Sequence, residues 1–115
     1  MEAEYMALAD ATCEAYYLSQ LVNEILPDMN ATPVVLYEDN QPCIRLAESQ
    51  TIHKKAKHIR LRYHIVRDAV NARDITVIWI PSNKMVADLL TKAPSKNIFQ
   101  SLYKKLIGQE PLTLD

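Results

Sequence analysis

Apolar residues follow two different periods along this chain. Short runs rich in β-branched residues predict buried strands at 34–37 and 75–80. Apolar positions three or four residues apart predict helices over 3–26, 41–49, 58–72, 84–92 and 95–107. A long helical crossover joins the two strands, which predicts a parallel pair with a right-handed connection.

Local chemistry sets the boundaries of these helices. Pro27 ends the first helix, because the residue before a proline avoids the helical conformation. Asn40 is the expected N-cap of the second helix, with Pro42 in its first turn. Gly108 is expected to close the last helix.

The same patterns predict which side chains face the core. In the third helix, Tyr63 and Val66 lie on the apolar stripe and Arg60 and Arg67 lie off it. Trp79 lies inside the second strand and is expected in the core rather than as a platform for stacked bases. The apolar stripe predicted for the first helix comprises Leu8, Ala11, Ala15, Leu18, Val22 and Ile25.

A parallel sheet of two strands is rarely a whole fold, because parallel sheets need more strands and cover on both faces. With 115 residues the chain is long enough for one domain. We therefore expect a partial domain over residues 1–110, part of something larger, followed by a tail at 111–115.

Charge is distributed unevenly along the chain. Residues 1–44 hold eight acids and no Lys or Arg, whereas residues 45–73 hold eight bases and two acids. This arrangement suits a carboxylate site for cations beside a surface for phosphates. Ordinary solvated helix faces explain it equally well.

Several classes of protein are disfavoured. There is no apolar run of membrane-spanning length and no basic start typical of a signal peptide. Cys13 and Cys43 form no C-x-x-C motif and are expected to be reduced, so we expect an intracellular protein, cytoplasmic or nuclear. No G-x-S-x-G or Gly-rich phosphate loop occurs, and the spacing of His53, His58 and His64 matches no zinc site.

Three acids are candidates for chemistry. Glu4 lies in the first turn of the first helix, Asp39 follows the first strand, and Asp88 lies in the helix after the second strand. Open α/β sheets place their sites at the carboxyl ends of strands, and hard oxygen ligands suit Mg²⁺ or Mn²⁺. Spacing alone does not decide the matter, because any chain with fourteen acids offers such a trio.

Five ordered segments add a more specific signal. They are Glu2-Ala3-Glu4-Tyr5-Met6-Ala7-Leu8, Tyr37-Glu38-Asp39-Asn40-Gln41, His53-Lys54-Lys55-Ala56-Lys57-His58-Ile59, Tyr63-His64 and Ala87-Asp88-Leu89-Leu90-Thr91-Lys92. With these segments in this order and spacing, the chain resembles the ribonuclease H domain of copia-type retrotransposon Pol polyproteins, over roughly residues 2–107.

The resemblance implies a fold and a reaction. The fold would be α/β and ribonuclease H-like, a mixed sheet flanked by helices, truncated here to about two parallel strands and five helices with the first three strands missing. The reaction would be hydrolysis of RNA in an RNA–DNA hybrid by two Mg²⁺ or Mn²⁺ ions.

The resemblance also assigns roles to single residues. Glu4, Asp39 and Asp88 match three of the four carboxylates that hold the metal ions and carry catalysis, and Glu2 and Glu38 are expected at the surface. The first Asp of the family has no counterpart, so we expect the chain to be inactive alone, unless a second polypeptide supplies the missing strands. The loop at 81–84 also lacks the His that cellular ribonucleases H place before the last Asp. Residues expected to contact nucleic acid are Asn40, Lys54, Lys55, Lys57, Arg60 and Arg62.

Two functions without catalysis remain open. The chain could bind nucleic acid through the basic segment at 53–67 and leave it uncut. Alternatively, the open edge of the strand at 34–37 could pair with another polypeptide.

Overall fold

The computed structural model describes residues 2–49 and 60–112, in two compact units, Met1–Trp79 and Ile80–Asp115. The first unit holds the helices α1 (Glu2–Ile25), α2 (Gln41–Glu48) and α3 (Arg60–Asn71), together with both strands. None of the helices in the described ranges is long and apolar enough to cross a membrane.

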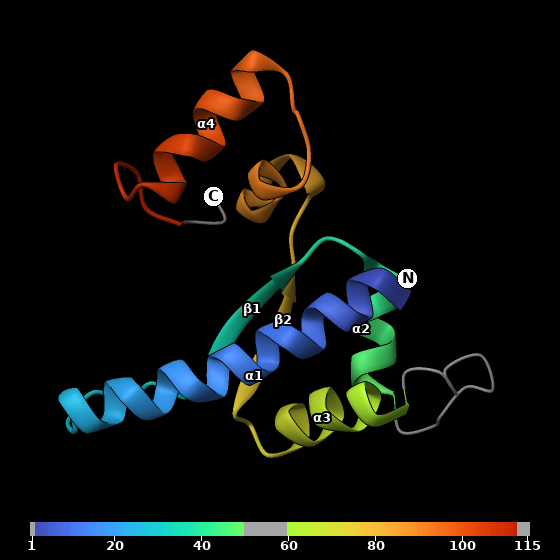
Figure 1. Ribbon diagram of the computed structural model, residues 1–115, viewed down its shortest axis with the longest axis vertical. Coiled ribbons are helices and arrows are strands. Elements are labelled where there is room, and N and C mark those ends of the chain that lie inside the picture. Colours follow the sequence, from blue (N-terminus) through green and yellow to red (C-terminus); the bar gives the residue numbers. More distant parts are fainter. Residues whose placement is uncertain (1, 50–59, 113–115) are drawn as a thin grey trace. The chain divides into compact units, whose positions relative to one another are not determined.

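The two strands, β1 (Val34–Glu38) and β2 (Ile75–Trp79), pair in parallel as predicted (Figure 1). Val34 lies opposite Ile75, and the backbone N–H of Val34 donates to the carbonyl of Asp74 at 2.9 Å. A parallel ladder in this register turns every second peptide of β1 away from β2. The described residues place no further strand on the outer edge of β1, so that edge is open.

Helix α1 covers one face of the sheet. The residues that it buries agree only in part with the apolar stripe predicted from the sequence. Its buried residues are Tyr5, Leu8, Ala9, Thr12, Ala15 and Ser19. Leu8 and Ala15 were expected there, but Leu18 and Ile25 are 52% and 67% exposed, so their assignment to the core is wrong. The last turns of α1 extend past the strands (Figure 1), where no described element covers them.

Helices α2 and α3 complete the core of the first unit. The chain enters α2 at Gln41, directly after the predicted cap, and leaves at Glu48, one residue before the predicted end. In α3, Tyr63 and Val66 are fully buried, as its stripe predicts. The core joins all three helices to one face of the sheet, through Tyr5, Leu8, Ala9, Ala15, Cys43, Leu46, Ala47, Tyr63, Val66, Ala69 and Ile75.

The second unit begins with two short 3₁₀ helices, Ser82–Lys84 and Val86–Leu90, in place of the α-helix predicted over 84–92. Met85 separates them in an extended conformation (φ −75°, ψ 98°) and is itself buried. So short a segment has little intrinsic helical stability, and burial of one side chain is enough to interrupt it.

Helix α4 (Lys96–Leu106) follows and contacts the 3₁₀ helix Val86–Leu90, and its Leu102 is buried. Gly108 has φ +79°, and the N–H of Gln109 donates to the carbonyl of Lys104 at 2.9 Å. The left-handed residue and this hydrogen bond between Gln109 and Lys104 terminate the helix, so the predicted role of Gly108 is confirmed.

Trp79 is the clearest departure from the predicted core. It is the last residue of β2 and is 46% exposed, so its assignment to the core is wrong. The strand pattern located the residue correctly, but the core cluster on this face of the sheet includes Ile75, with Val77 packed against it, and does not extend to Trp79. The indole at the carboxyl end of the strand is therefore left at the surface.

Candidate functional site

Asp39 lies at the carboxyl end of β1, in the two-residue connection to α2. Its side chain is partly buried, and its backbone carbonyl accepts a hydrogen bond of 3.2 Å from the indole Nε1 of Trp79. The bond ties the ends of the two strands together. It holds Asp39 at the edge where α/β sheets carry their sites.

Asn40 caps helix α2, as its position in the sequence predicts. Its Oδ1 accepts a hydrogen bond of 2.9 Å from the backbone N–H of Cys43, and its own backbone is extended (φ −92°, ψ 101°). The cap therefore occupies the amide oxygen. Contact of Asn40 with nucleic acid stays a prediction.

Glu38 is buried, only 8% exposed, so its expected place at the surface is wrong. Its Oε1 accepts a hydrogen bond of 2.9 Å from the backbone N–H of Asn40. Burial raises the pKa of this carboxyl above its usual value, although the backbone N–H of Asn40 partly opposes the rise. The alternation of side chains along β1 could have predicted this burial, because Glu38 lies on the same face of the strand as Val34 and Leu36.

Glu4 lies in the first turn of α1 and is partly buried, with its Oε2 inaccessible to solvent. It contributes to the pKa of Cys43, which burial and then Glu38 raise to about 12. Cys43 is in the first turn of α2, so Glu4 lies near the start of that helix. Figure 1 shows the N-terminal end of α1 beside α2. Glu4 and Asp39 therefore both belong to the first unit, Glu4 near the first turn of α2 and Asp39 two residues before that helix begins.

Asp88 belongs to the second unit, in the 3₁₀ helix Val86–Leu90. Its Oδ2 forms an ion pair of 3.3 Å with the Nζ of Lys92, and its side chain is 20% exposed. Such a partly exposed pair contributes at most about 1 kcal/mol of stability, so it leaves the carboxylate available for a stronger cation.

The three candidate carboxylates would need to lie close together to bind a metal ion. In residues 2–49 and 60–112, no group of three or more His, Cys, Asp or Glu side chains is arranged to hold a metal ion. Glu4 and Asp39 share the first unit and offer the hard oxygen ligands that Mg²⁺ prefers. A site that includes Asp88 stays a prediction.

The basic segment is only partly described. Arg60 is exposed and Arg62 is half-buried, both in the first turn of α3. The remaining cations predicted to contact phosphates, Lys54, Lys55 and Lys57, lie outside the described residues.

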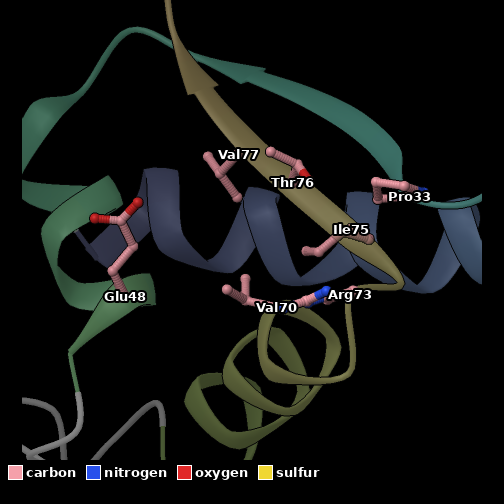
Figure 2. Close-up of a pocket in the computed structure, with 7 residues that line it drawn as sticks. All are labelled: Pro33, Glu48, Val70, Arg73, Ile75, Thr76 and Val77. Carbon is pink, nitrogen blue, oxygen red and sulfur yellow. The ribbon is translucent and has the colours of Figure 1, made fainter.

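A separate pocket of about 450 Å³ lies beside β2, between this strand and the helices α2 and α3 (Figure 2). Its charged residues are Arg73 and Glu48, and its remaining lining is mostly apolar: Pro33, Val70, Ile75, Thr76 and Val77. None of the residues predicted for catalysis or nucleic-acid contact lines it. We therefore do not count it as part of the candidate site.

Similarity to known proteins covers almost the whole chain. The chain is 35% identical over 107 residues to the retrovirus-related Pol polyprotein from transposon TNT 1-94 of Nicotiana tabacum, a match over 93% of this chain. It is 31% and 30% identical, each over 91% of its length, to the corresponding polyproteins from transposons RE2 and RE1 of Arabidopsis thaliana. Its homologues are retrovirus-related Pol polyproteins of plant transposons.

The matched region is only a small part of each relative's length. It spans 8% of the TNT 1-94 polyprotein and 7% of each of the other two. No family model matches the chain. No solved structure matches it either.

Proposed function

We propose that this Pol-like chain is part of a ribonuclease H-like domain that hydrolyses RNA in RNA–DNA hybrids. Two Mg²⁺ or Mn²⁺ ions would be held by Glu4, Asp39 and Asp88 together with a fourth carboxylate from another polypeptide segment. The ions would activate water and stabilise the leaving oxygen of the phosphodiester.

The observation that carries the proposal is the position of Glu4 relative to Asp39. They are 35 positions apart in the sequence, yet Glu4 lies near the first turn of α2, which begins two residues after Asp39. Carboxylate oxygens near the start of α2 and at the carboxyl end of a parallel strand support a site for divalent cations.

The open outer edge of β1 supports the need for a further segment. Val35 and Tyr37 are 42% and 36% exposed, and the register directs their peptide groups away from β2. An added strand would satisfy these groups. It would also be the natural carrier of a fourth carboxylate near Asp39.

A cleavage assay on a labelled RNA–DNA hybrid tests the proposal. The chain is assayed with Mg²⁺ and with Mn²⁺, alone and mixed with a polypeptide that carries the first three strands of a ribonuclease H-like domain. We expect cleavage in the mixture and its loss in Asp39→Asn and Glu4→Gln. Glu2→Gln is the matched control, because Glu2 shares the first turn of α1 but is exposed.

Two outcomes would contradict the nuclease. One is cleavage that survives Asp39→Asn. The other is absence of cleavage in every mixture when circular dichroism shows the chain to be folded. The second outcome would favour the non-catalytic function below.

Binding of nucleic acid without cleavage is the second candidate, and the exposed Arg60 at the start of α3 favours it. Phosphate contacts release counterions, so affinity should fall steeply with salt. Arg60→Glu should weaken binding and reduce the salt dependence, whereas Lys104→Glu in α4 should leave both unchanged. Salt-insensitive binding would exclude this candidate.

A further inference from the structure

Trp79 places an aromatic ring on the surface beside the candidate site. The ring is 46% exposed, and its Nε1 donates to the carbonyl of Asp39 at 3.2 Å. This bond satisfies the only polar atom of the indole and restrains the ring, so what remains for contact is an apolar aromatic surface.

Helix α2 supplies the other side of this surface. Gln41, Ile44 and Arg45 recur at helical spacing, opposite the buried face that carries Cys43 and Leu46. Gln41 and Arg45 are exposed, and no acid among the described residues forms an ion pair with Arg45. The guanidinium is therefore available to a ligand.

Together these residues line a shallow pocket. Its volume is about 210 Å³, and its lining consists of Gln41, Ile44, Arg45 and Trp79. Sites for drug-sized molecules usually range from about 300 to 1,000 Å³, so this one fits a single small planar group. An aromatic ring, a guanidinium and an amide are the groups that bind a nucleobase by stacking, charge and hydrogen bonding.

We propose that Trp79 and Arg45 hold an unpaired nucleobase of a nucleic-acid strand bound at the carboxyl end of the sheet. The base would stack on the indole, and Arg45 would contact its neighbouring phosphate or its ring plane. The inference rests on the proposed function in one respect, namely that nucleic acid binds at this end of the first unit. It adds a contact to a base, which neither the metal ions nor the basic segment supplies.

The chain contains a single tryptophan, so its own fluorescence reports on this site. The probe is a ten-nucleotide single-stranded DNA, compared with a strand of the same length in which every base is removed. We expect the intact strand to quench Trp79 and the abasic strand to leave its fluorescence unchanged. Fluorescence anisotropy of labelled strands measures total binding in the same solutions.

Substitutions then separate stacking from charge. Trp79→Leu should weaken binding of the intact strand about tenfold, and Trp79→Phe should retain most of the affinity, because stacking contributes this much per base. Arg45→Gln should also weaken binding, with circular dichroism unchanged. Arg73→Gln is the matched control, an exposed arginine of the same unit that does not line this pocket.

Failure of this inference differs from failure of the proposed function. Salt-dependent binding by anisotropy with unchanged tryptophan fluorescence, or equal quenching by the abasic strand, overturns the base site and leaves nucleic-acid binding intact. Absence of binding by anisotropy overturns both. Binding of free adenosine monophosphate as tight as that of the strand overturns the assignment to a nucleic-acid strand.

Discussion

The hydroxyl of Tyr5 donates a hydrogen bond of 3.2 Å to the backbone carbonyl of Tyr63, 58 residues further along the chain. The two rings are stacked with their centroids 6.1 Å apart, and neither side chain is exposed. The hydroxyl of Tyr63 in turn donates to the carbonyl of Ser49 at 2.7 Å, just after α2. Two tyrosines therefore link all three helices of the first unit.

Tyr5→Phe should lower the free energy of unfolding by about 1–2 kcal/mol, because it removes a buried hydrogen bond and leaves the ring in place. Urea unfolding followed by circular dichroism measures the change. Tyr17→Phe is the control, since Tyr17 is 62% exposed on the same helix and should change stability by less than about 0.5 kcal/mol. Equal effects of the two substitutions would contradict the role of Tyr5.

Asn40→Ala should destabilise the chain by about 1 kcal/mol through loss of the N-cap of α2, and Asn40→Ser should retain most of the stability. The pair also separates capping from nucleic-acid contact. If Asn40 only caps the helix, Asn40→Ser binds nucleic acid like the native chain. Weak binding by a fully stable Asn40→Ser would indicate direct contact.

Arg73→Gly should stabilise the chain by about 0.5–1 kcal/mol. Arg73 has φ +59° at the end of α3, where the N–H of Asp74 donates to the carbonyl of Ala69 at 2.9 Å. This left-handed position favours glycine, which has no Cβ to strain. Arg73→Ala keeps the Cβ and should not stabilise, so an equal gain from both would refute the backbone explanation.

The two thiols should react at very different rates with a thiol reagent such as dithionitrobenzoate at pH 8. Cys13 is exposed, whereas Cys43 is buried and its pKa is raised to about 12 by burial and by Glu38. Because the thiolate is the reactive form, one thiol should react at once and the second only on unfolding. Rapid reaction of both in folded protein would contradict the buried position of Cys43.

Ionisation of the Cys43 thiol should also lower the stability of the folded chain at alkaline pH. The folded chain holds this proton up to a pKa of about 12 and the unfolded chain only up to its ordinary 9.0. Between these values the folded state binds more protons, so the contribution of Cys43 to stability falls as pH rises through this window. Cys43→Ala should reduce the decline in a series of unfolding curves from pH 8 to 11.

Local elements of this fold were predictable because their causes lie within a few residues. The Asn40 cap, the stop at Pro27 and the left-handed Gly108 depend on hydrogen bonds and backbone angles of near neighbours. The parallel pairing of β1 and β2 followed from the long connection between them.

Burial depends on surfaces brought from far along the chain, so the sequence by itself predicted it less well. Leu18 has the same helical periodicity as Leu8, yet it is exposed because α1 is longer than the surface it covers. Trp79 was assigned to the core and is at the surface, whereas Glu38 was assigned to the surface and is buried. Only the packing of three helices on one face of the sheet decided these positions, since that packing fixes which part of each periodic stripe meets a partner.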